Sequence, residues 1–562
     1  MNKKLLEQAQ QAHQEGDLQS ALKKYQQLLE EDPQQPEAWH CAGILLVQLG
    51  RYDEALTYVD QAIQQQPKMA AFHNSRGNVL LRLRRFVEAT KAYYTAIQLD
   101  PHYAVAYNNL GNSFEHQHKI KNAIQAYKKA IVLYPHFPNA HFNYGRALLK
   151  QGDIESALKT LKKAIALDPN HTSALSQIAQ IYLNQADYQN AIHYYQKRLR
   201  IQPHHADTHH HLGIAWLKEK QWEKALHHLE QALALNDNEP LIHYHLATAY
   251  LQLKQRALAL RHYLRQIEKQ PHAESYYNIG ILLMYQEHHS EAIDYFQKAI
   301  AMDPYSSAAI VNIATLYLKL EKIPEAIAYY HQALKINPND PEIQFILSAL
   351  SQKKAPSQAP AEYLQHLFDQ YADYYDPHLT QYLSYQAPQQ LYQAIQLEST
   401  DSHPQWKILD LGCGTGLCGF LFKSMSRQLI GIDISEKMIE VARQKNVYDI
   451  LEVGNIEQAL DQHKNNHLIV AADVFTYIGD LDSIFKKVVD ALTPNGLFAF
   501  TIEKTAQKPY VLQQTIRYAH SQEYIQKLIE AHSFIVERFD NLILRKQKNQ
   551  PLEGYLVILR KK

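Results

Sequence analysis

A glycine-rich stretch around residue 412 has the spacing of a ligand-binding loop. Gly412, Gly414 and Gly416 follow the apolar run 408–411, and an apolar helix is predicted directly after them. A strand, a tight turn and a helix in this order form a nucleotide-binding crossover, in which glycine lets a ligand contact the backbone. About seventeen residues later, a second predicted strand ends at Asp433, where a carboxylate can accept hydrogen bonds from both hydroxyls of a ribose.

Two kinds of ligand fit this loop. Gly414, Gly416 and Gly419 satisfy the GxGxxG fingerprint of dinucleotide folds, which is weak evidence by itself. Asp410 lies inside the first strand, where its charge would repel a pyrophosphate but could bind the ammonium group of a methionine. Leu417 also stands where a dinucleotide turn would need a glycine. Together, the LDLGCGTG loop and the two acidic strand ends resemble class I S-adenosylmethionine-dependent methyltransferases.

The elements around the loop predict a Rossmann-like α/β domain. Strands alternate with helices after the loop, and this spacing gives a parallel sheet with helices on both faces. The predicted strands are 408–411, 428–433, a segment near 451, 467–473 and 496–503, and the predicted helices are 436–444 and 481–492.

The chain before this domain is a repeat. Proline recurs every 34 residues at Pro33, Pro67, Pro101, Pro135, Pro169 and Pro203, and alanine does so from Ala21 to Ala326 with one step of 33. Each of the ten units also has a small residue in its first helix, such as Gly77 or Gly111. Period, small residues and terminal proline resemble the tetratricopeptide repeat over about 340 residues. The expected fold is an all-α solenoid over residues 1–340, stacked into a curved array with a groove.

The groove is the expected site for a protein or peptide partner. Asparagines stand two residues before the small position in four units, at Asn109, Asn143, Asn278 and Asn312. In some tetratricopeptide repeats, asparagines at this place hold the backbone of an extended peptide, because an amide both donates and accepts. The alternative is that they only cap or solvate a polar face.

The 31 histidines raise the question of a metal site. His204, His205, His209, His210 and His211 gather in one unit, but no carboxylate or cysteine stands at ligand spacing around them. Successive helical residues also point to different faces. We therefore expect a surface histidine run and no metal.

Residues 341–362 are predicted as a capping helix followed by a short linker rich in Pro, Ala, Ser and Gln, and the catalytic domain is placed at 363–562. The segment 367–560 resembles bacterial methyltransferases that are predicted to follow tetratricopeptide repeats, through FDQYADYYDPHL, AADVFTYIGDL and RYAHS. The chain departs from that family at Ile516 and Ser533, where glycine is expected, and at Asn455, where aspartate is common.

This resemblance implies residue roles around S-adenosylmethionine. Asp410 and the backbone of Gly412, Gly414 and Gly416 would hold its methionine end, and Asp433 its ribose. The adenine would lie between Ile434, Met438 and Ile456, with Asn455 at its edge, and Ala472 and Asp473 would end the fourth strand beside the sulfonium. For Met438 and Ile456, plain core packing is the alternative.

Methyl transfer needs a base only if the acceptor must lose a proton. The candidates for that base, or for orienting the acceptor, are Asp473, Tyr477, Glu503, Tyr518 and His520. The unperturbed pKa of histidine suits proton transfer at neutral pH. Alternatively, RYAHS is a structural corner in which Arg517 pairs with a carboxylate and His520 caps the next helix. On resemblance alone, Tyr375 and Tyr385 are expected in a lid over the cofactor.

The two halves together predict a methyltransferase whose repeats recruit a protein or peptide substrate or partner, since fusion raises the local concentration of the bound partner. One alternative is a scaffold or assembly protein with a vestigial or regulatory cofactor site. Another is a methyltransferase for a small molecule or nucleic acid.

Composition narrows the class of protein further. Lys plus Arg and Asp plus Glu each number 57, so there is no basic excess that would make nucleic acid the expected partner. No apolar run approaches the length of a membrane span, and no secretory signal is expected. Cys41, Cys413 and Cys418 are too few for a disulfide framework, which fits a cytoplasmic protein.

Overall fold

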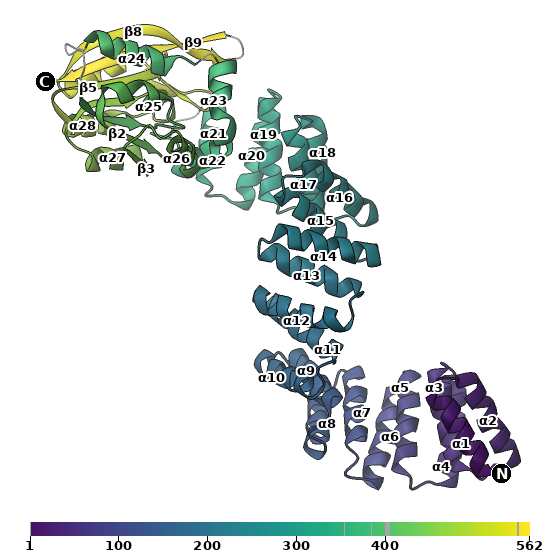
Figure 1. Cartoon of the computed structure of the whole chain (residues 1–562). Helices are drawn as coiled ribbons and strands as arrows, with labels where there is room; N and C mark the ends of the chain where they lie inside the picture. The colour runs from purple at the N-terminus through teal and green to yellow at the C-terminus, as the bar shows by residue number, and fades with distance from the viewer. Residues whose placement is uncertain (1, 353–354, 384, 399–404, 508, 548–549) are drawn as a thin grey trace. The chain divides into compact units, whose positions relative to one another are not determined.

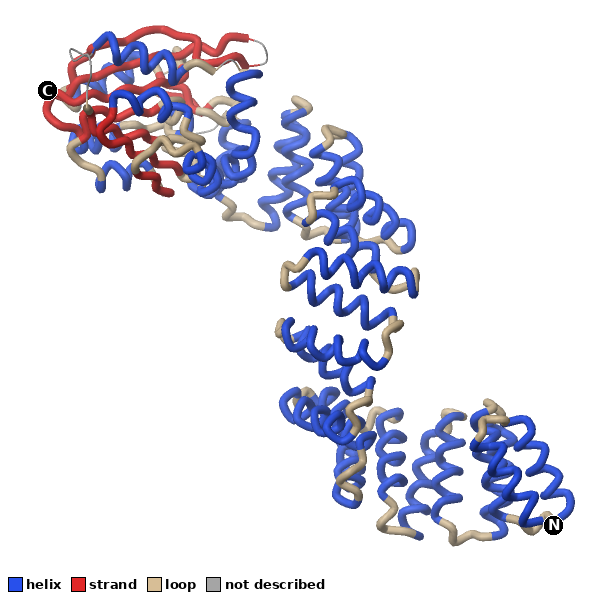
Figure 2. Tube along the Cα trace, viewed as in Figure 1, coloured by secondary structure: helices blue, strands red, loops and turns tan. Residues whose placement is uncertain are grey.

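The computed structural model (Figure 1) describes residues 2–352, 355–383, 385–398, 405–507, 509–547 and 550–562. The chain divides into two compact units, Met1–Pro271 and His272–Lys562. The described part of the first unit consists of helices and turns, and the strands of the second begin at Trp406 (Figure 2). Within the described ranges, no helix combines the length and apolarity that crossing a membrane requires.

The predicted helical repeats are confirmed as ten helix pairs within residues 2–336. Those of the first unit are α1 (Asn2–Gln14) with α2 (Leu18–Glu31), α3 (Pro36–Gln48) with α4 (Tyr52–Gln65), α5 (Ala70–Arg82) with α6 (Phe86–Leu99), α7 (Ala104–His116) with α8 (Ile120–Leu133), α9 (Pro138–Gln151) with α10 (Ile154–Leu167), α11 (Thr172–Asn184) with α12 (Tyr188–Ile201), α13 (Ala206–Lys218) with α14 (Trp222–Leu235), and α15 (Ile242–Gln252) with α16 (Arg256–Lys269). The second unit holds α17 (Ala273–Tyr285) with α18 (His289–Met302) and α19 (Ser307–Lys319) with α20 (Ile323–Ile336).

The small residue of each unit is explained by the aromatic or aliphatic side chain that packs on it. A Cβ added to Gly77 would lie 2.5 Å from Cε1 of Tyr93, and one added to Gly111 would lie 2.4 Å from Cε1 of Tyr127. Both tyrosines are fully buried. The two helices of a pair therefore approach closely only because the first helix has no side chain at that point.

Helix α21 (Pro341–Leu350) covers the last repeat. Ile343 and Ile346 pack with Tyr330 of α20. Another part of the same helix faces the C-terminal domain, because Phe345 packs with Tyr518. The capping helix thus belongs to two apolar clusters at once.

The C-terminal domain opens with α22 (Ala361–Tyr371) and α24 (Ala387–Glu398), which precede a seven-stranded sheet of order β3-β2-β1-β4-β5-β9-β8. Its strands are β1 (Trp406–Leu411), β2 (Ser426–Asp433), β3 (Ile450–Val453), β4 (Asn466–Ala471), β5 (Leu492–Glu503), β8 (Phe534–Gln547) and β9 (Gln550–Lys561). β1 to β5 pair in parallel. The chain order therefore reverses between β1 and β4, and such a switch point places a ligand crevice at the carboxyl ends of these strands.

Both faces of the sheet are covered by helices. Leu409 in β1 faces a cluster built with α27 (Ile456–Gln462), α28 (Asp482–Ala491) and α29 (Gln522–Ala531). Its neighbour Ile408 faces the opposite cluster, built with α24 and α25 (Leu417–Phe422). Adjacent residues on opposite faces are the period-2 pattern of a strand buried on both sides.

Three features of this domain were not predicted. β9 pairs antiparallel with β5 and with β8, so only part of the sheet is parallel. The β8–β9 pair needs no crossover helix, because these two strands follow one another along the chain. A separate two-stranded sheet joins β6 (Tyr510–Leu512) and β7 (Tyr518–His520), and the short helix α27 was missed.

Candidate active site

The glycine loop leaves its backbone open toward one side. Gly412, Gly414 and Gly416 have φ angles of +64°, +54° and +90°. A Cβ on Gly412 would lie 2.7 Å from Cγ2 of Val474, whereas one on Gly414 would meet only Tyr375, at 3.8 Å. Glycine is therefore needed at both positions for its backbone conformation, and at Gly414 the loop has free space in front of it.

Asp433 ends β2 beside this loop. The N–H groups of Gly414 and Ser435 each donate to one of its carboxylate oxygens, both at 2.9 Å. Burial raises the pKa of Asp433 to about 6, and these N–H groups oppose the rise. Each oxygen keeps a second lone pair, so the carboxylate can still accept hydroxyl groups of a ligand.

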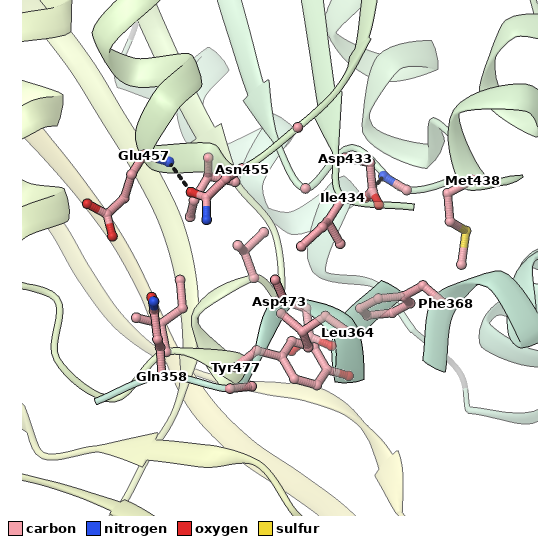
Figure 3. Close-up of a pocket in the computed structure, with 18 of the residues that line it drawn as sticks. Gln358, Leu364, Phe368, Asp433, Ile434, Met438, Asn455, Glu457, Asp473 and Tyr477 are labelled. Atoms are coloured by element: carbon pink, nitrogen blue, oxygen red, sulfur yellow. Dashed lines mark hydrogen bonds between the residues drawn. The ribbon is translucent and has the colours of Figure 1, made fainter. Parts of the chain in front are cut away.

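A cavity of about 900 Å³, including its open mouth, lies in front of the loop (Figure 3). Eight of the ten predicted cofactor residues line it: Gly412, Gly414, Asp433, Ile434, Met438, Asn455, Ile456 and Ala472. The predicted catalytic residues Asp473 and Tyr477 line it as well.

Asp410 and Gly416 do not line this cavity, because Tyr448 occupies the space beside them. The Tyr448 hydroxyl donates to the Asp410 carboxylate at 2.6 Å. Cβ atoms added to Gly416 and Gly431 would lie 3.0 and 2.8 Å from its ring. Burial raises the pKa of Asp410 to about 7, and the Tyr448 hydrogen bond opposes this. The structure thus gives no direct contact between Asp410 and a ligand in the cavity.

Asn455, which stands where the similar methyltransferases commonly have aspartate, has a local structural role. Its side-chain oxygen accepts the N–H of Glu457 at 2.8 Å and caps α27 (Figure 3). The same amide lines the cavity and presents its nitrogen as a donor. Ile516 and Ser533, where glycine was expected, have φ angles of +62° and +56°. Both positions therefore keep the backbone conformation that favours glycine.

Asp473 belongs to a network of two carboxylates and two arginines. Arg545 in β8 donates to Asp473 and to Glu503, both at 2.5 Å. Nη1 of Arg517 lies 4.0 Å from Asp473 and 3.6 Å from Glu503. The predicted pairing of Arg517 with a carboxylate is present, and Arg545 is a partner that the sequence did not reveal.

His520, Tyr518 and Glu503 lie away from the cavity. The ring of His520 is fully buried in β7, and its Nε2 donates to the carbonyl of Gly479 at 3.1 Å. Burial lowers its pKa to about 4. We therefore withdraw His520 as a candidate base. It does not cap α29 either, because Ser521 takes that position.

The two residues predicted to form a lid lie in different places. Tyr375 lines the cavity, whereas Tyr385 is buried beside Leu544 and does not. Sequence reasoning missed four wall residues. Gln358 and Ala359 come from the predicted linker, and Leu364 and Phe368 come from α22, at the start of the predicted catalytic domain. The aromatic run of FDQYADYYDPHL was the available signal for α22, whereas nothing in SQAP distinguished it from a free connection.

In the repeats, the predicted groove asparagines bond between neighbouring units. Asn109 donates to Asn74 at 3.0 Å, and Asn143 donates to Asn108 at 3.0 Å. Asn312 donates to the Tyr277 hydroxyl at 3.3 Å, and for Asn278 no side-chain hydrogen bond is found within the described residues. Three of the four amides are therefore parts of inter-repeat contacts.

The histidines of the seventh and eighth units are largely paired with each other and are not all at the surface. His209 contacts His228 at 3.1 Å, and His243 contacts His262 at 3.0 Å. His210 is buried rather than exposed. Among the residues that the structure describes, no cluster of three or more His, Cys, Asp or Glu could hold a metal ion.

Comparison with protein families places both halves of the chain. The profile described as "Methyltransferase domain" matches residues 402–549. Tetratricopeptide repeat profiles match 24–57, 42–104, 206–239, 244–307 and 283–351, and the profile "Cytochrome c-type biogenesis protein H TPR domain" matches 92–209. The chain thus combines tetratricopeptide repeats with a methyltransferase domain.

Similar curated proteins include two kinds of O-methyltransferase. A ubiquinone biosynthesis O-methyltransferase of Pelagibacter ubique is 34% identical over 110 residues, which are 19% of this chain and 45% of that protein. A malonyl-[acyl-carrier protein] O-methyltransferase of Serratia marcescens is 26% identical over 100 residues, 18% of this chain and 39% of that protein. The chain therefore spans less than half the length of these two relatives.

Solved structures of repeat proteins also match. The crystal structure of MamA is 25% identical and covers 29% of this chain and 96% of its own, with a TM-score of 0.27. The crystal structure of YrrB, a "TPR protein with an unusual peptide-binding site", is 24% identical and covers 33% of this chain and 96% of its own, with a TM-score of 0.29.

Proposed function

We propose that this chain is an S-adenosylmethionine-dependent methyltransferase whose repeat array recruits a protein or peptide substrate or partner. The observation that carries the first half is the convergence on one cavity of glycine loop, ribose-binding acid and apolar walls. These parts come from the ends of β1, β2, β3 and β4, so only the parallel sheet brings them together.

The donor set of the cavity fits S-adenosylmethionine. The open face of Gly414 leaves room for the methionine end, and the free lone pairs of Asp433 suit the two ribose hydroxyls. Ile434, Met438 and Ile456 provide apolar surface for the adenine, and Asn455 offers an amide at its edge. The cofactor supplies an activated methyl group on a sulfonium.

The protein's own contribution is then alignment and exclusion of water. Asp473 and Tyr477 lie on one wall of the cavity, next to Leu364 and Phe368 of α22 (Figure 3). Displacement at a methyl group is in line, so holding the acceptor opposite the leaving sulfur supplies much of the rate. Asp473 can accept a proton from an acceptor that arrives protonated, because its Oδ1 has no hydrogen-bond partner in the described part of the chain.

Recruitment through the repeats rests on the arrangement of their polar side chains. The amides of Asn109 and Asn143 are partly exposed and stand at matching positions of successive units. The Asn109 amide donates to Asn74 and Asn78, so both of its donors are in use and only its oxygen keeps a lone pair. Asn143 donates once, to Asn108, and keeps a second donor and its acceptor oxygen. The two amides therefore offer a peptide backbone two acceptors and one donor.

A second function is favoured by the relatives. Their names give ubiquinone biosynthesis and malonyl-[acyl-carrier protein] as pathway and substrate, so an oxygen of a small molecule or of a carrier-bound acyl group is an alternative acceptor. A scaffold with a vestigial site is less well supported, because both Asp433 and the open face of Gly414 are present.

The decisive experiment is a calorimetric titration of the full chain with S-adenosylmethionine, with NADH as the control ligand. Saturable binding that Asp433→Ala loses supports the cofactor assignment. A folded protein that binds NADH instead, or neither ligand, contradicts it. Recruitment is tested by cross-linking the full chain in cell extract with labelled cofactor, comparing the native chain with Asn109→Ala/Asn143→Ala at equal thermal stability. Unchanged labelling of the captured proteins would remove the asparagines from the proposal.

A further inference from the structure

Residues 361–376, here called the cover segment, form one wall of the candidate cofactor cavity. Leu364 and Phe368 of α22 line the cavity together with Tyr375 (Figure 3). A Cβ on Gly414 would meet only Tyr375 within 4 Å, so this ring faces the open side of the glycine loop. The cover segment therefore bounds the space in which the methionine end of the proposed cofactor would lie.

The Asp376 carboxylate connects the end of the cover segment to two other elements. It accepts hydrogen bonds from the hydroxyl of Thr415 and from the ammonium group of Lys445. Thr415 belongs to the glycine loop and is fully buried, and Lys445 directly follows α26 (Glu436–Gln444). The Asp376–Lys445 ion pair is itself partly buried, so salt screens it less than a surface pair. One carboxylate thus joins the cover segment, the glycine loop and α26.

The Asp369 carboxylate connects α22 to the residue that orients Asp433. The Ser435 hydroxyl donates to Asp369 at 2.5 Å, and the N–H of the same serine donates to Asp433 at 2.9 Å. The Ser435 oxygen also accepts the N–H of Met438 and caps α26. Through Ser435, the cover segment is therefore linked to the carboxylate proposed to bind the ribose.

The two acids act on different parts of the same cavity. Asp376 holds the side with the glycine loop, and Asp369 holds the side with Asp433. Hydrogen bonds in which one partner is charged are the stronger kind, and a binding site is precise only when its lining residues are held by such contacts behind them. A wall that is already held in place also needs no ordering when a ligand binds.

We propose that Asp369 and Asp376 are positioning residues for S-adenosylmethionine. They hold the cover segment, the glycine loop and Asp433 in one arrangement around the cofactor and thereby slow its dissociation. Among the described residues that line the cavity neither acid is present, so both act through their neighbours. This inference rests on the proposed methyltransferase function.

The first test measures how fast methyl-labelled S-adenosylmethionine leaves the full chain when it is chased with excess S-adenosylhomocysteine. Asp376→Ala should raise this rate by about tenfold or more, since one hydrogen bond to a charged group contributes about that factor. Asp376→Asn should raise it less, because an amide oxygen still accepts from Thr415. Glu362→Gln, an exposed acid of the same helix, is the matched control and should leave the rate unchanged.

A double-mutant cycle tests whether Asp376 works through Lys445. Lys445→Met should also raise the dissociation rate. The two substitutions together should raise it by less than the product of their separate effects, because each alone already breaks the shared ion pair. Effects that simply multiply would show that the pair does not act on the cofactor as a unit.

Asp369 is tested by the pH dependence of the affinity. Asp369→Asn keeps an acceptor for the Ser435 hydroxyl but removes a negative charge. Burial is the main cause of the raised pKa of Asp433, and the charge of Asp369 adds to it. The affinity of Asp369→Asn should therefore begin to fall at a lower pH than the native affinity does. A role of Asp369 in folding stability alone would not move this midpoint.

The outcomes separate the two proposals. A folded native chain that does not bind S-adenosylmethionine would count against the proposed function. If the native chain binds, an Asp376→Ala protein of equal melting temperature that releases the cofactor at the native rate would overturn the positioning role alone, as would an unmoved pH midpoint in Asp369→Asn. Hydrogen exchange of the native chain decides the matter if the variants do not fold. S-adenosylhomocysteine should slow amide exchange within α22, and exchange that this ligand leaves unchanged would overturn the inference.

Discussion

Replacing Asp433 gives the sharpest test of the cofactor site. Asp433 is 8% exposed, and its carboxylate is oriented by the N–H groups of Gly414 and Ser435. Each hydrogen bond to a charged group contributes about 1.5–3 kcal/mol. Two ribose hydroxyls would therefore contribute about 3–6 kcal/mol, and Asp433→Ala should weaken S-adenosylmethionine binding by a factor of about 10²–10⁴. Asp433→Asn should lose less, because an amide oxygen can still accept.

The same residue predicts a pH dependence of the affinity. Burial raises the pKa of Asp433 to about 6, and the ribose hydroxyls prefer the ionised form. Affinity should therefore be constant above this pKa and should fall as pH drops through about 6, approaching tenfold for each further pH unit. In the ligand-free protein the sign is opposite. The buried Asp433 lowers stability as pH rises from about 4 to about 6, because the folded state then binds more protons than the unfolded state.

Calorimetric titrations between pH 5 and pH 8 would measure the affinity at each pH, and melting curves over the same range would measure the stability. Glu440→Gln on α26 (Glu436–Gln444) is a matched control, since it removes an exposed acid close to the site. An Asp433→Ala protein that binds within threefold of the native affinity would refute the ribose role. An affinity that falls equally with pH in Asp433→Asn would show that another group, such as Asp473, causes the dependence.

Three further predictions follow from the packing. Tyr448→Phe removes the one side-chain hydrogen-bond donor found for the Asp410 carboxylate in the described residues. In melting experiments it should lower the free energy of unfolding by about 1–3 kcal/mol. Tyr392→Phe, which removes an exposed hydroxyl, is the control and should change this free energy little. Gly111→Ala places a Cβ against Tyr127 and should cost about 1–3 kcal/mol in denaturant unfolding, while Gly454→Ala, which meets nothing within 4 Å, serves as control. Burial, together with the neighbouring His209, lowers the pKa of His228 to about 4, below the unfolded value of about 6.5. Its contribution to stability is therefore full above about pH 6.5 and is lost as pH falls toward 4, and melting curves of His228→Gln should show a smaller loss.

The sequence predicted that most residues of the candidate cavity lie close together, because these residues follow strand ends. Parallel strands align their carboxyl ends, so Gly412, Asp433, Asn455 and Ala472 had to meet once the alternation of strands and helices was recognised. Asp410 shows the limit of that argument. Its environment is determined by Tyr448, which lies 38 residues later in the sequence. A side-chain contact between such distant residues cannot be predicted from hydrophobic periodicity.

The surroundings of Asp473 could not be predicted for a related reason. Arg545 comes from β8, which lies beyond the strands that the alternation rule predicted, and it meets Asp473 from 72 residues away. His520 has the right chemistry for a base, but residue type does not tell which way a short strand turns its side chains. In β7 it points to a buried backbone carbonyl and away from the cavity.

The segment between the repeats and the catalytic domain packs against both, although its composition predicted only a free linker. Within the unit His272–Lys562, α21 contacts the last repeat through Ile346 and the catalytic domain through Phe345. The Tyr518 hydroxyl donates to the carbonyl of Pro356 at 2.7 Å, and the N–H of Ala359 donates to the carbonyl of Tyr477 at 2.9 Å.

These contacts hold the segment against β7 and against Tyr477, which lines the candidate cavity. A shift of α21 would be transmitted to the wall formed by Gln358 and Ala359, because both are fixed by backbone hydrogen bonds or bridges to the loop that contains Tyr477. The end of the repeat array and the mouth of the candidate active site are therefore parts of one packed structure. Under the proposed function, a partner that contacts the last repeat through α21 would contact the same packed elements that line the candidate active site.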